Sequence, residues 1–301
     1  MTATLFITLL IASLLSALLY VILKYFQKWN IYNLHGLTFN YITAATFSFF
    51  SNYEENSALL PQVPDFLPFT ILIGCLFISV FYIAALTAQK CGIAVTSIAG
   101  KMSMVVPITM SFWLYGDKIT IVKVIGILLA LTAVVLSSIR KENKTENTTE
   151  NTTATAGKWL WILPVLLFAG SGVVDSSISI SQHYFIDEKN QDIFMAFLFG
   201  SAGLIGAIAT IYKRFKDGVR VEIKSIGAGV FLGITNYYSL DFLLRALAAE
   251  GAESSVVFAL CNVLVVLISS LFAITLFKEK LSKANFGGLA LAIISILLLS
   301  R

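Results

Sequence analysis

A few charged side chains lie inside long apolar segments, where a charge needs a chemical reason. Lys101 interrupts the stretch SIAGKMSMVVP (97–107), and at ~1.5 Å of helical rise per residue it lies about 12 Å into the apolar run that begins at residue 93. Asp175 and Asp241 lie well inside two other apolar runs, and by the same rise they share one level, ~12 Å deeper than Lys101. A buried ammonium group favours an anionic or zwitterionic ligand, and a buried carboxylate can bind and release a proton. These residues therefore predict ligand binding and proton coupling.

Each of these charges also has a structural explanation. An unpaired charge at the depth of Lys101 costs at least ~2.5–3.5 kcal/mol on insertion scales, so we expect Lys101 to face a hydrated cavity or a partner. The alternative is a tilted or shifted helix that lets Lys101 reach the interface. Arg245 follows Asp241 by four residues, so the two can also form a purely local ion pair. Asp175 is the first candidate for a proton-coupling residue, and Asp241, with Arg245 as its charge partner, is the second.

Neutral polar side chains in the same runs add hydrogen-bonding groups. Asn236, Tyr237 and Tyr238 precede Asp241 on one run, although tyrosines near a membrane surface often serve only as anchors. Amides and hydroxyls at this depth can orient a small polar substrate. The predicted substrate-binding residues are Lys101, Ser97, Asn236, Tyr237, Tyr238 and Asn262. Because no catalytic set, phosphate-binding glycine loop or metal-type cysteine spacing is present, we expect no enzyme activity, no cofactor and no metal site.

Composition identifies the elements that must position these residues. Of the 301 residues, 57% are hydrophobic and 13% are charged, and the mean hydropathy is +0.85, which predicts a membrane protein. Continuous apolar runs of about 20 residues fit helical crossings, whereas a barrel would alternate over about 10 residues. We expect ten transmembrane helices in an all-α integral membrane protein, at 3–23, 34–51, 66–88, 93–115, 120–138, 159–181, 191–212, 225–247, 252–276 and 284–300.

The basic residues are distributed unequally over the two sides of this arrangement. Of the 21 Lys and Arg, fifteen follow odd-numbered runs, five lie on the opposite side, and Lys101 is the remaining one. Because cytoplasmic connectors are enriched in Lys and Arg, this count predicts that the odd-to-even connectors are cytoplasmic and that both termini lie outside.

The chain also repeats itself on either side of a polar Asn/Thr-rich linker. With an offset of 162 residues, Asp117 in YGDKIT matches Glu279 in FKEKLS, and Asn262 matches Gly100, next to Lys101. An odd number of crossings per half inverts one half relative to the other, a plan common in secondary transporters. We expect a first five-helix repeat at 1–138, a linker at 139–158 and a second five-helix repeat at 159–301.

The ten-helix plan, the apolar helix with Pro107, the following YGDKIT turn and its counterpart FKEKLSKANFGG resemble the EamA-type branch of the drug/metabolite transporter superfamily. The similarity covers nearly the whole chain, with motifs that are specific for the fold and weak for the substrate. Two positions depart from the family pattern: the first copy has Asp117 where Glu is usual, and the N-terminus lacks the frequent basic residues.

We therefore expect a secondary active transporter that moves a small polar or amphipathic metabolite by alternating access, with proton coupling as one option. The alternative is a membrane sensor or scaffold that binds a ligand without moving it. The expected partners are a small-molecule substrate and the lipid bilayer, and not nucleic acid, while homo-oligomer formation stays open. We expect a multi-pass protein in the cell (inner) membrane of a bacterium.

Overall fold

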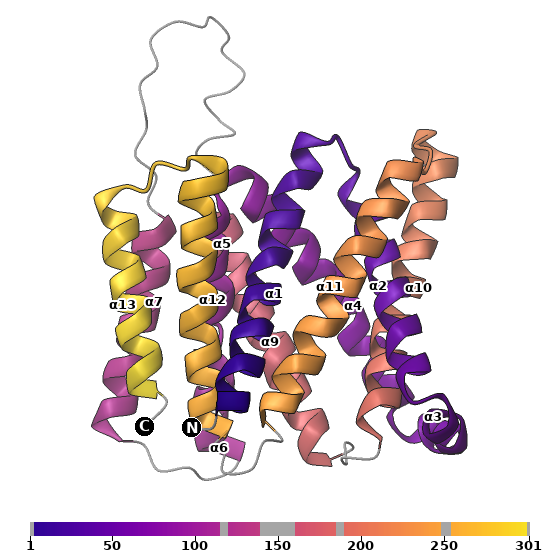
Figure 1. Ribbon diagram of the computed structural model, residues 1–301, viewed down its shortest axis with the longest axis horizontal. Coiled ribbons are helices and arrows are strands. Elements are labelled where there is room, and N and C mark those ends of the chain that lie inside the picture. The colour runs from indigo at the N-terminus through magenta and orange to yellow at the C-terminus, as the bar shows by residue number, and fades with distance from the viewer. Residues whose placement is uncertain (1–2, 115–119, 139–159, 185–189, 248–253, 300–301) are drawn as a thin grey trace, which may run out of the picture.

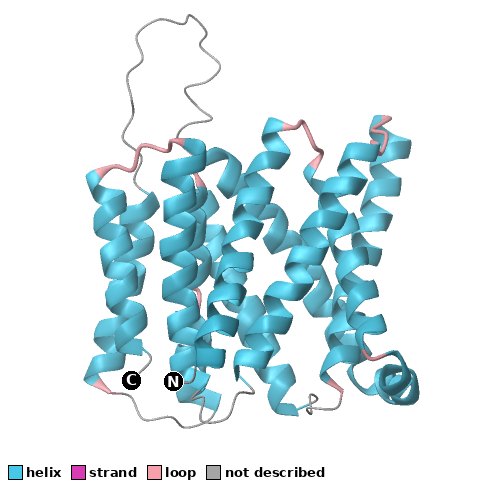
Figure 2. Ribbon diagram, in the orientation of Figure 1, coloured by secondary structure: helices cyan, strands magenta, loops and turns pink. Residues whose placement is uncertain are grey.

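The computed structural model describes residues 3–114, 120–138, 160–184, 190–247 and 254–299, and the regular elements within these ranges are all helices (Figures 1 and 2). In chain order they are α1 (Ala3–Lys28), α2 (Asn33–Ser51), α3 (Tyr53–Leu59), the 3-10 turn η1 (Leu60–Gln62), α4 (Val63–Lys90), α5 (Ile93–Met102), α6 (Val105–Leu114), α7 (Ile121–Ser138), α9 (Ile162–Tyr184), α10 (Gln191–Asp217), α11 (Ile223–Leu247), α12 (Ser254–Phe277) and α13 (Lys283–Leu299). The predicted all-α class is thus confirmed.

Several of these helices have the length and composition of membrane spans. By both criteria four qualify within the described ranges: Leu5–Lys28, Phe66–Lys90, Gln191–Asp217 and Leu260–Phe277. Shorter apolar helices cover Ile93–Pro107, Val124–Leu136, Ile162–Ile178 and Lys283–Leu298. This composition is consistent with a membrane protein.

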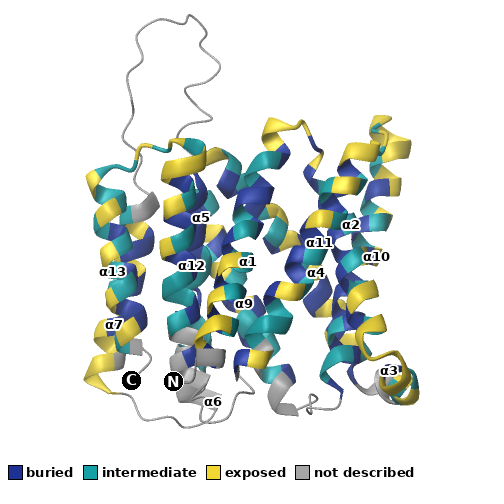
Figure 3. Ribbon diagram, viewed as in Figure 1, coloured by how far each residue is buried: buried dark blue, intermediate teal, exposed yellow. Residues whose placement is uncertain are grey.

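Many residues along the helices are exposed (Figure 3), and large apolar side chains are among them. On α7, Leu128 is 58% exposed and Val135 59%, and on α10 Leu204 is 63% exposed. In water such a surface would be an aggregation hazard, whereas in a bilayer these side chains meet lipid tails. The exterior is therefore suited to lipid.

The chain reverses direction at the two ends of the bundle. In Figure 1, the connectors that follow α1, α10 and α12 lie at the end opposite to the start of α1 and the end of α13. Lys28, Lys216 and Lys280 belong to or border these connectors, so these three of the basic residues grouped by the sequence count lie at one end. The structure itself does not contain a membrane, so the cytoplasmic assignment of that end stays a prediction.

The run expected as one helix at 93–115 is divided into α5 and α6, which are separated by Ser103 and Met104. Pro107 explains the position of the break, because it has no N–H to donate to the carbonyl four residues earlier, that of Ser103. This carbonyl instead accepts a hydrogen bond from the Val106 N–H at 2.9 Å, which forms a tighter turn. The carbonyl that Pro107 deprives of its usual helical donor is therefore paired within the turn.

Glycine residues let α11 approach α2 closely. A Cβ atom added at Gly233 would lie 2.5 Å from the backbone oxygen of Asn40, and one added at Gly229 would lie 2.6 Å from that of Gly36. Contacts this short are possible only without a side chain. Gly229 and Gly233 are the two glycines of the segment GVFLG (229–233). Their spacing of four residues is typical of closely packed membrane helices, and the segment serves helix packing here.

The helices pack in pairs that connect the two parts of the chain. The pairs with the most extensive contact are α2 with α10, α7 with α13, α2 with α11, α1 with α11, and α4 with α10. Further contacts join α1 to α12, α4 to α9, and α5 to both α9 and α12. Helices from before and after residue 150 are therefore interleaved and do not form two separate bundles.

Two features expected from the sequence lie outside the described residues, and one helix of the structure was not expected. Asp117 and the linker 139–158 lie outside the described residues. Helix α3, which sits in the connector between two expected spans, was not predicted; Asn56 on it donates to the carbonyl of Phe49 on α2 at 2.8 Å.

The close α2–α11 contact predicts that even the smallest added side chain destabilises the fold. Replacing Gly233 with Ala forces the two helices apart, and overpacking of this kind costs about 1–3 kcal/mol. Gly227 lies on the same helix with nothing within 4 Å of an added Cβ, so Gly227→Ala is the matched control and leaves stability unchanged or slightly higher. Thermal unfolding of the purified variants in detergent measures both, and equal melting temperatures would contradict the packing argument.

Candidate functional site

Lys101 lies in the last turn of α5, just before the break, and is partly buried. It interacts electrostatically with three side chains from three other helices: Tyr20 of α1, Asp175 of α9 and Cys261 of α12. No salt bridge within 4 Å involves Lys101 in the described part of the chain, so the attraction between its ammonium group and Asp175 acts through space. The structure thus brings together two charges that sequence reasoning had placed about 12 Å apart in depth.

Asp175 contacts the break through the hydroxyl group of Ser103. The Ser103 Oγ lies 2.8 Å from the Asp175 Oδ2 and 2.6 Å from the carbonyl oxygen of Gly100. A hydroxyl group has a single proton, so Ser103 cannot donate fully to both oxygens. When Asp175 carries a proton, both contacts are satisfied, because Asp175 donates to Ser103 and Ser103 donates to Gly100. The geometry therefore suits a carboxyl group that gains and loses a proton.

Helix α9 can hold Asp175 in this place because it packs tightly on α6. A Cβ added at Gly172 would lie 2.3 Å from Cγ2 of Val106, so the absence of a side chain allows the close approach. Asp175 follows Gly172 by three residues and lies on nearly the same face of the helix. Gly172 and Val106 thus determine how near the carboxyl group comes to Ser103.

Two of the predicted neutral residues lie on the helices that carry this group. Asn262 of α12 donates from Nδ2 to the sulfur of Met104, inside the break, at 3.5 Å. Sulfur is a weak acceptor, so this amide remains available for a better partner. Ser97 on α5 is fully buried and donates to the carbonyl of Ala94 at 2.9 Å, within its own helix.

Asp241 and Arg245 form an ion pair with each other. The Arg245 Nε lies 3.0 Å from the Asp241 Oδ2, and the Arg245 side chain is 65% exposed. The guanidinium group also lies over the ring of Phe242, 5.7 Å from its centroid. The two residues thus form the ion pair that their spacing allows. The contacts described for these two residues are with their own helix, and none reaches Lys101 or Asp175.

Asn236, Tyr237 and Tyr238 belong to a second polar group, between α2 and α11. Asn236 is buried and its Nδ2 lies 3.4 Å from the Asn40 Oδ1, while the Nδ2 of Asn40 is buried without a partner. The ring of Tyr237 packs on that of Tyr238, with 5.1 Å between the ring centroids. The structure therefore divides the predicted site residues into two groups on different helix pairs.

Sequence reasoning missed Tyr20, Ser103 and Cys261. Ser103 is two residues from Lys101, and Pro107, four residues further on, can disturb the helix there. The Tyr20 hydroxyl would lie 3.0 Å from a Cβ added at Gly100, but its run gives no sign of this proximity. Cys261 is buried, and its position in an apolar run gives no sign that it lies near Lys101. Finding Tyr20 and Cys261 required the helix arrangement.

Comparison with known proteins gives limited information. No family model matches the chain. An uncharacterized protein of Haemophilus influenzae is 27% identical over 295 residues, which cover 96% of this chain and 95% of that protein. A solved structure described only as the crystal structure of a protein superposes with a TM-score of 0.63 at 15% identity, over 99% of this chain and 96% of that one. This likeness shows that the fold occurs in an experimental structure.

The Ser103–Asp175 contact predicts that removing the Ser103 hydroxyl lowers the free energy of unfolding more than removing another buried hydroxyl, that of Ser181. Ser103→Ala leaves the partly buried carboxyl group with one partner fewer, which costs about 1–3 kcal/mol. Ser181 is the matched control, because it is fully buried on α9 and its hydroxyl contacts only the Ser177 carbonyl of its own helix. Ser181→Ala is expected to cost less than about 1 kcal/mol. Unfolding in detergent measures the difference, and equal losses would argue against a specific Ser103–Asp175 contact.

Proposed function

We propose that the protein is a secondary active transporter for a small polar or amphipathic metabolite, of the EamA type of the drug/metabolite transporter superfamily. One observation carries this proposal: Lys101 and Asp175 both lie beside a break between two apolar helices, and their charges interact there. Broken helices at the depth of the membrane are tolerated only inside protein or beside water, and they form the binding sites of many transporters. An ammonium group and a carboxyl group at such a place can bind a ligand and a proton.

The packing of the helices supports two inverted five-helix repeats. We assign α1, α2, α4, α5–α6 and α7 to the first repeat, and α9, α10, α11, α12 and α13 to the second. Exchanging each helix for its counterpart turns the α2–α11 pair into α10–α4, the α1–α11 pair into α9–α4, and the α1–α12 pair into α9–α5, all of which are contacts in the structure. This pseudo-two-fold pattern is typical of transporters in which two inverted repeats surround a shared site.

Within this site we assign a role to each residue. Lys101 binds a negatively charged group of the substrate, and Asn262 and Ser97 belong to the helices that line the same place. Asp175 binds the coupling proton, with Ser103 holding it against the break. Asn236, Tyr237 and Tyr238 form a second place for substrate groups between α2 and α11, next to the Asp241–Arg245 pair, which remains the second candidate for proton coupling.

The opposite charges of Lys101 and Asp175 link substrate binding to proton binding at this site. A proton on Asp175 removes the negative charge that attracts Lys101, so that the ammonium group is free for an anionic group of the substrate. Thermodynamic reciprocity then requires that the bound anion also strengthens proton binding. Proton and anionic substrate therefore favour each other, and both would move in the same direction across the membrane.

The first functional prediction concerns ligand affinity and its pH dependence. Carboxylate and zwitterionic metabolites are screened by the rise in melting temperature that they cause in the purified protein. For a ligand so found, Lys101→Gln weakens binding at least about tenfold through the lost charge. Wild-type affinity falls as pH rises and Asp175 loses its proton, whereas Asp175→Asn gives a flat pH profile. Lys213→Gln, in an exposed surface pair, serves as the control and keeps the wild-type profile.

A second functional prediction separates a carrier from a sensor or scaffold. In proteoliposomes loaded with unlabelled ligand, a carrier accumulates labelled ligand by counterflow, because one protein conformation exchanges with the other. Lys101→Gln abolishes this accumulation, and Asp175→Asn leaves exchange but removes its response to an imposed pH gradient. Binding without counterflow would support the sensor and refute transport.

A further inference from the structure

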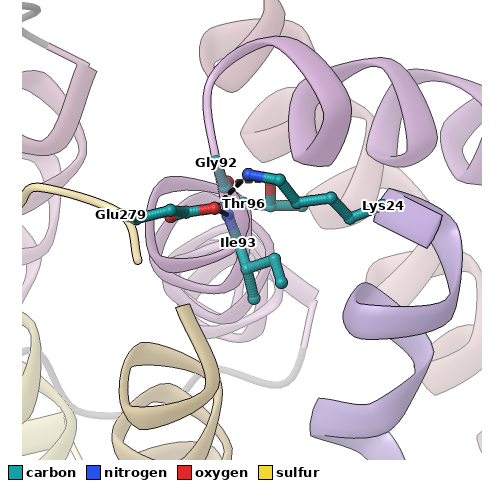
Figure 4. A network of polar contacts seen from close by, with 5 residues as sticks. All are labelled: Lys24, Gly92, Ile93, Thr96 and Glu279. Atoms are coloured by element: carbon teal, nitrogen blue, oxygen red, sulfur yellow. Dashed lines mark hydrogen bonds and ion pairs between the residues drawn. The ribbon is translucent and has the colours of Figure 1, made fainter. Parts of the chain in front are cut away.

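A second charged network joins three segments at the end of the bundle where the basic connectors lie (Figure 4). Glu279, in the connector between α12 and α13, forms a salt bridge through Oε1 with the ammonium group of Lys24 at the end of α1. The same oxygen accepts a hydrogen bond from the backbone N–H of Ile93, the first residue of α5, at 3.1 Å. One carboxylate therefore ties together α1, α5 and the α12–α13 connector.

The local backbone is shaped for this contact. Lys278 has a φ of 50° and ends α12, and the Glu279 N–H then bonds to the Ala273 carbonyl at 2.9 Å, which turns Glu279 back toward the bundle. Opposite it, Gly92 has a φ of 103°, and a Cβ there would lie 2.6 Å from the Glu279 Oε2. The positive φ and the lack of space both require glycine at this position.

The salt bridge differs from the other ion pairs that the described residues form. The Lys24 and Glu279 side chains are only 18% and 15% exposed, and the Lys24 ammonium group also lies 5.1 Å from the centroid of the Phe277 ring. The remaining pairs join residues two or four positions apart. Lys24–Glu279 thus connects distant segments, and it does so across the boundary between the two proposed repeats.

The network is linked to the Lys101 group through two helices. Ile93 and Lys101 are eight residues apart on α5, or about 12 Å along the helix. Lys24 lies one helical turn beyond Tyr20 on α1, and Tyr20 lies beside Gly100. Helices α1 and α5 are thus fastened at Lys24–Glu279 and meet again beside Lys101. A movement that separates Glu279 from Lys24 and Ile93 would expose the Lys101 group from this end.

We propose that the Lys24–Glu279 salt bridge is a gate that closes the path to the Lys101 group from the end with the basic connectors. The proposal rests on the proposed transport function. In the closed state Glu279 neutralises Lys24 and caps α5, and in the open state water replaces these contacts. Removing either charge therefore shifts the population toward the open state, because the lost attraction exists only in the closed one.

The three native cysteines provide a test that needs no substrate. Cys261 is buried in the Lys101 group, whereas Cys75 is exposed and Cys91 is intermediate. In a background with Cys75→Ser and Cys91→Ser, the rate at which an anionic, membrane-impermeant methanethiosulfonate reagent labels Cys261 reports access to the site. Applying the reagent to inverted and to right-side-out vesicles identifies the side from which the thiol is reached.

Glu279→Gln and Lys24→Gln are each expected to raise the labelling rate about tenfold from the side of the basic connectors, and not from the other side. Asp217→Asn is the matched control, since it removes an exposed salt bridge with Lys213 at the same end and leaves the rate unchanged. The exchange Lys24→Glu with Glu279→Lys restores the ion pair but not the hydrogen bond from the Ile93 N–H, so it labels more slowly than either single reversal and faster than the wild type. Elution of each variant as a single species excludes unfolding as the cause.

Unchanged rates in both single variants would overturn the gate, as would an equal increase in Asp217→Asn or on both sides of the membrane. An exchanged pair that labels as fast as the single reversals would show that the salt bridge does not hold this end closed. Because labelling needs no transport, its failure together with successful counterflow would refute the gate alone. Absence of counterflow would instead refute the proposed function.

Discussion

The structure depends on one constraint: polar groups among apolar helices must find their partners within the protein, because lipid offers none. Helix α5 shows how the constraint is met. It has only ten residues, and each end lies against other elements. At its start the Glu279 carboxylate accepts from the Ile93 N–H, and after its end the Ser103 carbonyl accepts from Val106. Backbone groups at both ends of this short helix thus have hydrogen-bond partners within the protein, and Lys101 lies between the two ends.

Much of the fold was predictable because apolar runs and charge distribution are direct consequences of the membrane. The all-helical class, the helices around Lys101, Asp175 and Asp241, and the close packing of GVFLG could be obtained from local sequence. The position of the α5–α6 break could not be predicted from the sequence. Pro107 indicates a disturbed helix, but a proline is compatible with several structures, including a simple kink. Helix α3 was missed because a short amphipathic segment in a connector lacks a strong apolar signal.

The types of residue in the candidate site could be predicted from the sequence, but not which of these residues lie close to each other. Depth estimates from straight helices put Asp175 level with Asp241 and about 12 Å from Lys101. The structure places Asp175 near Lys101 and pairs Asp241 with Arg245, because the break, the helix tilt and the glycine contact at Gly172 change which side chains meet. Contacts between distant segments, such as Lys24 with Glu279, depend on how helices are arranged in three dimensions, and a single sequence carries no measure of that arrangement.

Polar contacts of the described residues repeatedly join the two proposed repeats. Ser103 meets Asp175, Met104 meets Asn262, Asn40 meets Asn236, and Lys24 meets Glu279. Hydrogen bonds between membrane helices contribute on average only about 0.6 kcal/mol each, since alternative partners are available. Two of these four are also long, at 3.4 and 3.5 Å. Contacts of this kind can be exchanged at little cost when helices move. Tight glycine packing, by contrast, holds α2 against α11 and α9 against α6, so movement is expected between these units and not within them.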